Sequence, residues 1–367
     1  MMSGVGAVYL ELGEYNEALD CYLKSLNLSK SAHHNIEHPA IAYVNAGVSS
    51  AYAKLGEHTL ALEYANQSLE MFKTVLGREV VHPYIAEQHM RIGTVHFDMC
   101  EHQLALDHMT RALNMAEELY GKDSNHNTIA HCYSNFGNVY AAQGKYNKAL
   151  ENYKKALKIQ QVISDRTGTP LRFLYNSIGI AYGGLGKHRE ALEYFEKALS
   201  VNGKTFGENF DHPDIAMNYL NIANVYNKQG SYELALFNAL KSLTMYKKCY
   251  GETANHPELA RSYSVIARAY TGQGEYKAAI ENCFKSLKIL QSILGADAKS
   301  IDMAGAYCTM AAAYKGQAKY KEALESAHKS LDILKVIHGA DTQHPDIADS
   351  YLMVVDIYSM LSQESTL

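Results

Sequence analysis

The sequence contains no tryptophan, only six prolines and no long uninterrupted apolar run. Six prolines in 367 residues are few for a fold rich in irregular loops. No stretch approaches the ~18–20 apolar residues that span a membrane. Residues 1–12 also lack a basic flank followed by an apolar run, so we expect no signal peptide. These absences predict a protein of mostly regular structure with no membrane partner.

Paired cysteines and a strong net charge are also missing. The six cysteines are scattered and form no C-x-x-C pair, so we expect reduced thiols that pack inside a cytoplasmic protein. The formal net charge is -5, which gives no reason to expect nucleic acid or an anionic membrane surface as the main partner.

What the sequence does contain is a repeat. One tight-turn position recurs at Gly13, Gly56, Cys100, Gly144, Gly186, Gly230, Gly274, Ala318 and Ser362. The spacing between successive positions is 42–44 residues. We call these the turn positions and count every other register position from them. A period held this closely predicts a stacked array, in which each unit packs only on its neighbours.

Other positions repeat with the turn. The fifth residue after it is Ala18, Ala61, Ala105, Ala149, Ala191, Ala235, Ala279 and Ala323. The twelfth residue is Ser or Ala and the thirteenth is Leu in all eight copies. Small residues at fixed places allow two helix backbones to approach closely, and the leucine fills the space between repeats. Each unit is therefore predicted to be a pair of helices closed by a tight turn.

The helix ends recur as well. Glycine lies 21 residues after the turn position at Gly77, Gly121, Gly207, Gly251, Gly295 and Gly339, where it is expected to end a helix in the left-handed conformation. A new helix then opens with His-Pro in most units, and Pro170 opens the unit whose linker is shorter. His38, His82, His126, His212, His256 and His344 share this position, so we expect them to cap the helix or pack on the previous repeat.

The repeat resembles the tetratricopeptide repeat. Its pattern is clearest in Tyr175-x2-Ile178-Gly179-x2-Tyr182…Ala191-x3-Phe195. HEAT and armadillo repeats have a similar period but lack this fixed pair of small residues. The units are about ten residues longer than the usual ~34, and their His-Pro-x-Ile-Ala start resembles the kinesin light chain repeats. The shorter fourth linker is closer to the adaptors that join Gα subunits to the mitotic spindle.

The resemblance implies an all-α, right-handed solenoid of antiparallel helix pairs. We expect one array over residues 1–367, with a partial repeat at 1–34 and a lone final helix at 344–362. Full repeats start near residues 38, 82, 126, 168, 212, 256 and 300. The array departs from its relatives in two ways. It lacks the coiled coil of kinesin light chains and the Gα-binding motifs of the spindle adaptors. In its third repeat, His89, His96 and Cys100 replace two aromatic residues and the turn glycine.

The resemblance also implies where a ligand binds. First helices line the concave groove, at the positions ten, six, three and two residues before the turn. Candidate groove residues at these places are Asn138, Asn176, Asn224, Asn227, Lys228, Arg268 and Lys315. An Asn can donate and accept at once, which suits a peptide backbone, and the basic residues favour an acidic peptide. The alternative is that these polar residues only keep an exposed face soluble.

No pattern indicates catalysis, a metal or a cofactor. The histidines of the third repeat, His89, His96, His102 and His108, form no zinc-binding spacing. The glycines at 183, 184 and 186 follow no strand and precede no Lys-Ser/Thr, so they do not form a phosphate loop. We therefore predict a non-enzymatic adaptor that binds a partner peptide or helix. The alternatives are the cargo-binding part of a kinesin light chain-like motor adaptor and the regulatory repeats of a larger signalling protein.

The final helix suggests a further contact. Leu352, Val355 and Tyr358 belong to an apolar face that no second helix covers. A solenoid usually ends in a polar cap. We expect this face to be covered by a partner, by further repeats or by a second copy of the chain through residues 344–362.

Overall fold

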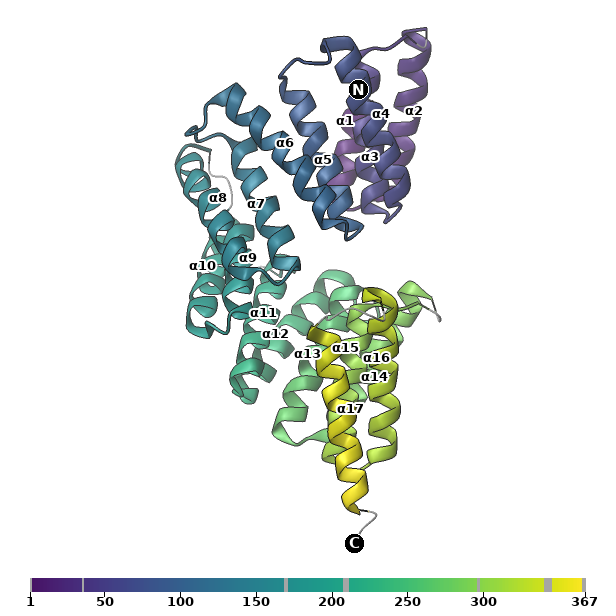
Figure 1. The fold of residues 1–367 in the computed structure, drawn as a ribbon, viewed down its shortest axis with the longest axis vertical. Coiled ribbons are helices and arrows are strands. Elements are labelled where there is room, and N and C mark those ends of the chain that lie inside the picture. Colours follow the sequence, from purple (N-terminus) through teal and green to yellow (C-terminus); the bar gives the residue numbers. More distant parts are fainter. Residues whose placement is uncertain are drawn as a thin grey trace. The chain divides into compact units, whose positions relative to one another are not determined.

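The computed structural model describes residues 2–34, 36–167, 171–206, 211–295, 298–339 and 345–364. Within these ranges the chain forms seventeen α-helices and no strand. It divides into two compact units, Met1–Leu185 (unit 1) and Gly186–Leu367 (unit 2), which are described separately below. Figure 1 shows the helices of both units. The expected all-helical class is confirmed.

Unit 1 contains nine of the helices. They are α1 (Met2–Leu12), α2 (Tyr15–Ala32), α3 (Pro39–Lys54), α4 (His58–Leu76), α5 (Pro83–Asp98), α6 (His102–Tyr120), α7 (Asn127–Ala142), α8 (Tyr146–Thr167) and α9 (Arg172–Gly184).

Unit 2 contains the other eight. They are α10 (His188–Phe206), α11 (Pro213–Gln229), α12 (Tyr232–Tyr250), α13 (Pro257–Gln273), α14 (Tyr276–Leu294), α15 (Ile301–Gly316), α16 (Tyr320–His338) and α17 (Pro345–Glu364).

Within each unit the helices pack in chain order. Each helix contacts the next one, and the first helices of neighbouring repeats also touch, as α3 and α5 do in unit 1 and α13 and α15 in unit 2. First helices therefore form one layer and second helices the other. This is the expected solenoid of antiparallel helix pairs.

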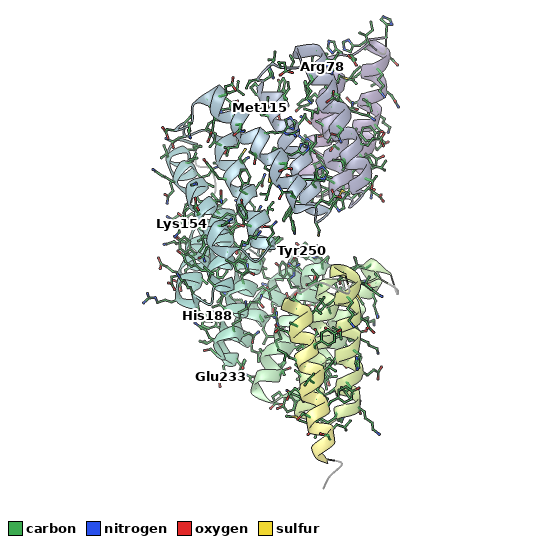
Figure 2. The ribbon with its side chains drawn as sticks, in the orientation of Figure 1. Arg78, Met115, Lys154, His188, Glu233 and Tyr250 are labelled. Carbon is green, nitrogen blue, oxygen red and sulfur yellow. The ribbon has the colours of Figure 1, made fainter. Side chains whose placement is uncertain are left out.

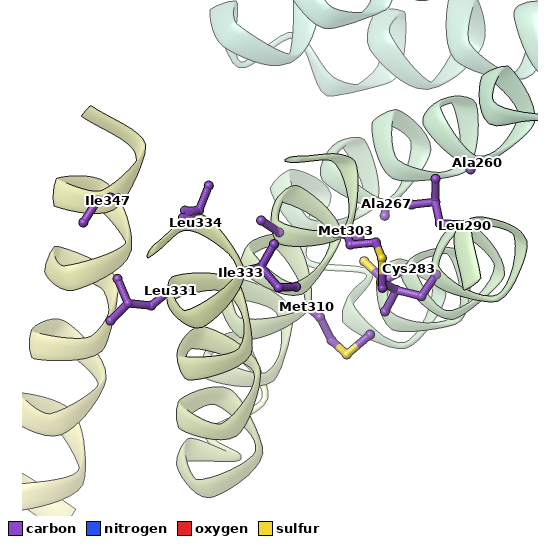
Figure 3. Packing of buried hydrophobic residues seen from close by; sticks show 13 residues of the cluster. Ala260, Ala267, Cys283, Leu290, Met303, Met310, Leu331, Ile333, Leu334 and Ile347 are labelled. Carbon is purple, nitrogen blue, oxygen red and sulfur yellow. The ribbon is translucent and has the colours of Figure 1, made fainter. Parts of the chain in front are cut away.

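Small residues bring the paired helices together. All eight alanines five residues after the turn are fully buried. At Gly137 of α7, an added Cβ would lie 2.4 Å from the ring of Tyr153 in α8. Figure 3 shows the core of unit 2, where Leu290 of α14, Met303 of α15 and Ile347 of α17 belong to one buried cluster. The expected close approach of helix backbones is thus confirmed.

The turns and the histidine caps also form as expected. All eight turn positions from Gly13 to Ala318 have positive φ, including Cys100 (61°) and Ala318 (58°).

The Nδ1 atom of His38 accepts a hydrogen bond from the backbone N–H two residues ahead, at 3.1 Å. His82, His126, His212 and His256 do the same at 3.1–3.3 Å. His126 and His256 also stack on Tyr120 and Tyr250 of the preceding helix, so capping and packing occur together. His344, Pro170 and Gly207 lie outside the described residues.

Two local expectations are wrong. The glycines that end the second helices have positive φ, but their ψ values of 136–160° place them in an extended region and not in the left-handed helical one. The chain must leave the helix in an extended direction to reach the next His-Pro start, and glycine alone tolerates this combination of positive φ and extended ψ.

The final helix continues to Glu364, so Ser362 is helical and not a turn. Among the described residues, no second helix folds back to hold a turn there.

Replacing Gly137 with alanine tests the close approach of α7 and α8. The new Cβ would overlap the Tyr153 ring, so we expect the free energy of unfolding to fall by about 1–3 kcal/mol. Gly305 in α15 is a matched helical glycine with open space around it. Gly305→Ala should raise stability by about 0.5–1 kcal/mol. Urea unfolding of both variants measures the difference, and equal effects would contradict the packing argument.

Candidate functional site

The first-helix face of unit 1 is hollowed between α3 and α5. The hollow has a volume of about 610 Å³. Its polar lining consists of Ser50, Lys54, His58, Glu87, Arg91, Thr94 and Asp98. Ser50 and Thr94 lie six residues before their turns, and Lys54 and Asp98 lie two before. The hollow therefore uses register positions that the family resemblance assigns to a ligand groove.

A second hollow continues the first one between α5 and α7. Its volume is about 550 Å³, and it shares Glu87 and Met90 with the first. Tyr84 of α5 and His131 and Ser134 of α7 complete its lining. The two hollows thus extend along three successive first helices, which is the arrangement that an extended ligand requires.

Arg91 is the main cation of the first hollow. Its Nη1 donates to Ser50 Oγ of the preceding repeat, and its Nη2 donates to Glu87 Oε1 at 3.2 Å. The Nε atom is buried and has no hydrogen-bond partner. Burial lowers the pKa of the Arg91 guanidinium from its ordinary value. A half-buried cation whose buried Nε has no partner favours an anion or a carbonyl oxygen in the hollow.

The hollow is not filled where His58 and Asp98 line it, because neither residue supplies the contact that other repeats have there. In three other repeats a tyrosine two residues after the turn lies against a glycine of the next first helix: Tyr146 on Gly184, Tyr232 on Gly272 and Tyr276 on Gly316. In the register, His58 and Asp98 take the places of that tyrosine and that glycine. Burial raises the pKa of Asp98, while the positive charges of His58 and Lys54 act to lower it. A histidine and an aspartate thus replace a filled aromatic contact.

Unit 1 contains two of the candidate groove residues. The Oδ1 atom of Asn138 accepts a hydrogen bond from Tyr153 Oη at 2.8 Å. Asn176 is buried and only 7% exposed. The Asn138 amide NH₂ can therefore still donate to a ligand, but its oxygen already accepts the Tyr153 hydrogen bond. Asn176 has little exposed surface with which to contact a ligand.

Unit 2 contains the other five. Asn224 Oδ1 accepts from Arg268 Nη2 at 2.8 Å, which joins neighbouring repeats. Asn227 Nδ2 donates to Val265 O at 3.1 Å. Lys228 is exposed. Lys315 Nζ lies 2.6 Å from Asp356 Oδ2 of α17, so its charge is paired. The structure brings Asn224 and Arg268 together, and the Lys315–Asp356 pair reduces the positive charge that was expected in the later repeats.

Sequence reasoning missed Arg91 and Glu87. Arg91 lies nine residues before its turn, and Asn135, Ser177 and Thr309 are among the uncharged residues at that position in other repeats. An arginine at a position otherwise filled by uncharged residues was a usable signal. The family resemblance does not assign this position to the groove.

Three histidines form a cluster between α5 and α6, behind the first hollow. The Nδ1 atoms of His89 and His108 lie 3.1 Å apart, and His96 Nδ1 lies 2.6 Å from Glu101 Oε2. Burial is the main cause that lowers the pKa values of His89 and His108 to about 4, and nearby positive charges add to it. The pair is therefore neutral near pH 7, with one ring donating to the other.

The described residues contain no other obvious chemical site. No group of three His, Cys, Asp or Glu side chains among them is arranged to hold a metal ion. Burial raises the pKa of the Cys132 and Cys283 thiols to about 12, so both are unreactive packing residues. No described helix combines the length and apolar character needed to cross a membrane.

The neutral histidine pair predicts an acid-sensitive unit 1. Because the folded-state pKa of His89 lies below its ordinary value of 6.5, the stabilisation is complete above pH 6.5 and is lost as the pH falls toward 4. We expect the free energy of unfolding to drop by roughly 2 kcal/mol between pH 7 and pH 5. His89→Tyr restores the residue that Tyr133 occupies in the register and should reduce the loss. Urea unfolding at pH 7 and pH 5 measures it, and an identical loss in both proteins would contradict the assignment.

Comparison with protein families gives a consistent match. A family model described as tetratricopeptide repeat matches residues 1–74, 84–161, 128–204, 170–248 and 214–292. A second model with the same description matches residues 303–346. A comparison with curated protein sequences gives no match.

Several solved structures are similar to this chain at low sequence identity, and those with TM-scores above 0.5 share its fold. A Rap protein complexed with Competence and Sporulation Factor is 13% identical, with a TM-score of 0.60 over 99% of this chain and 98% of that one. A tetratricopeptide repeat protein from Parabacteroides merdae is 16% identical, with a TM-score of 0.55 over 86% and 98%. A putative kinesin light chain repeat protein from Podosopora anserina is 19% identical, with a TM-score of 0.48 over 58% and 99%.

Proposed function

Because the chain belongs to the tetratricopeptide repeat family, whose members serve generally as protein-interaction scaffolds, we propose that it is a non-enzymatic adaptor that binds an extended peptide segment along its first-helix face. The observation that carries the proposal is the pair of connected hollows on α3, α5 and α7. The peptide backbone would use Asn138 and Ser134, and a carboxylate or carbonyl oxygen would approach Arg91. A cytoplasmic location is part of the same proposal.

The charges of the face support a peptide with an acidic residue. Arg91 and Lys54 supply donors in unit 1, and Arg268 and Lys228 supply them in unit 2. Glu87 and Asp98 lie beside the first two, so the preference is local to one or two positions of the peptide. The Rap protein of similar fold was solved as a complex with Competence and Sporulation Factor, which is consistent with a fold that holds a partner.

Two related roles remain alternatives to a free-standing adaptor. The long repeats resemble those of kinesin light chains, so the chain could serve as the cargo-binding part of a motor adaptor. It could equally be the regulatory repeat region of a larger signalling protein. Both roles use the same peptide-binding face. They differ from the free-standing adaptor only in the segments attached to the array.

A peptide-library selection followed by affinity measurement on the full chain tests the face. Arg91→Ala should weaken selected peptides at least tenfold, because it removes the only guanidinium of the first hollow. Asn138→Ala, Asn224→Ala and Arg268→Ala should each weaken those peptides that reach them. Isothermal titration with each variant gives the affinities, and circular dichroism checks that the helices remain.

Arg111→Ala is the matched control. Arg111 is exposed on α6, a second helix, so its loss should leave peptide affinity unchanged. If peptides bind and none of the four groove substitutions matters, the groove assignment is wrong. If Arg111→Ala weakens binding as much as Arg91→Ala, the ligand lies on the other face.

Self-association through α17 is a separate part of the proposal. Leu352 is 67% exposed and Val355 is 63% exposed on this helix. If a second copy covers them, the molar mass from light scattering should exceed that of one chain, and Leu352→Glu should return it to the monomer value. A wild-type chain that is monomeric at every accessible concentration would exclude this contact.

A further inference from the structure

The outer face of α12 carries an exposed apolar strip. Its exposed residues are Glu233, Leu234, Phe237, Leu240, Lys241, Thr244 and Lys248, which follow one another along the helix. Phe237 is 65% exposed, Leu234 49% and Leu240 42%. Figure 2 labels Glu233 and Tyr250, close to the two ends of this helix. None of these three apolar side chains belongs to a described buried cluster of unit 2, and each is at least 42% exposed.

The repeat register shows that Phe237 is an exception. The residue seven after the turn is acidic in the seven other second helices: Asp20, Glu63, Asp107, Glu151, Glu193, Glu281 and Glu325. Phe237 alone is apolar at this position. A second helix folds and packs with an acidic residue there, so the phenylalanine is not required by the scaffold.

The exception leaves a lysine without its usual partner. In α2, α8, α10 and α16 the acidic residue pairs with the lysine four positions later, at 2.6–2.8 Å. In α12 the lysine remains as Lys241, but Phe237 replaces the carboxylate. The Lys241 Nζ atom instead donates to Tyr219 Oη at 2.7 Å and lies 4.0 Å from the centre of that ring. The equivalent lysines Lys155, Lys285 and Lys329 lie 5.5–5.8 Å from their tyrosine rings.

The other charges of the strip do not supply the missing carboxylate. Lys248 pairs with Asp211 at 3.0 Å, and Glu233 lies two helical turns before Lys241 on α12. The strip therefore combines a group of apolar side chains with an ammonium group that has no ion-pair partner on its own helix. An occupant that complements it must be apolar in the middle and acidic at the Lys241 end.

We propose that the outer face of α12, formed by Leu234, Phe237, Leu240 and Lys241, docks an acidic amphipathic helix of a partner protein. The apolar side of that helix covers Phe237, and its carboxylate provides to Lys241 the ion pair that other repeats form within one helix. The site lies on a second helix and is distinct from the first-helix face to which the peptide was assigned above.

Phe237→Glu is the sharpest test, because it installs the acidic residue type that every other repeat has. The variant should keep its helical content and its melting temperature, since the introduced carboxylate and Lys241 would form the usual pair. The probes are two designed amphipathic helical peptides with the same leucine face, one flanked by glutamates and one by lysines. By fluorescence anisotropy the full chain should bind the glutamate peptide at least tenfold more tightly than the lysine peptide. Phe237→Glu should lose that affinity at least tenfold.

Two further variants make the test specific. Leu104→Glu places the same charge on an exposed apolar position of α6 and should leave binding unchanged. Lys241→Glu should reverse the preference toward the lysine peptide. The proposal is overturned if the glutamate peptide shows no preference, or if Phe237→Glu binds as wild type does. It is also overturned if Phe237→Glu instead abolishes a dimer seen by light scattering or binding to phosphatidylserine vesicles, because the occupant is then a second copy or a lipid surface.

Discussion

The close approach of the two helices within each repeat is the constraint on which the structure depends. At Gly137 an added Cβ would overlap Tyr153, and at Ser49 the hydroxyl donates to Ala61 O of the paired helix at 2.7 Å. Backbones this close accept only Gly, Ala or Ser at the contact. The residue seven before the turn is Gly, Ala or Ser in all eight pairs, so each pair keeps room for this contact. The recurrence of small residues at fixed register positions follows from this close approach.

A strict register makes each departure informative. His89 replaces an aromatic packing residue, Arg91 places a guanidinium where other repeats have uncharged residues, and Phe237 replaces an acidic residue. The scaffold works without any of the three, since other repeats do. Each departure also has a physical cost: a buried imidazole that must stay neutral, a cation removed from water, or an aromatic ring left exposed. Residues that are energetically unfavourable and that the fold does not require are therefore the best indicators of function in this chain.

The sequence predicted local features well and side-chain partners poorly. The start of α11 at Pro213, the tight turn at Cys100 and the capping by His256 follow from residues adjacent in the chain. Capping at the helix start and turn geometry depend on such neighbours alone, which is why they were predictable. The glycines that end the second helices were predicted wrongly, because their conformation also depends on the direction to the next repeat.

The side chains that bond to the candidate groove residues come from distant parts of the chain. Asn224 meets Arg268, and Lys315 meets Asp356, across 44 and 41 residues of chain. Which side chains reach one another depends on the angle between successive repeats, and no local pattern encodes that angle. A family resemblance could therefore name candidate groove positions, whereas the hydrogen-bond partners of each residue required the structure.

The two faces of the array differ in how freely they can change. On the second helices, the usual acid–lysine pair is exposed, and such pairs contribute only about 0–1 kcal/mol. Exchanging the acid for phenylalanine at Phe237 thus alters the surface of one repeat without disturbing its neighbours. On the first helices, Arg91 contacts Ser50 of the preceding repeat, so a change there affects two repeats together. A second helix can therefore acquire a distinct outer surface in a single repeat, whereas a change at Arg91 on the first-helix face also affects the preceding repeat.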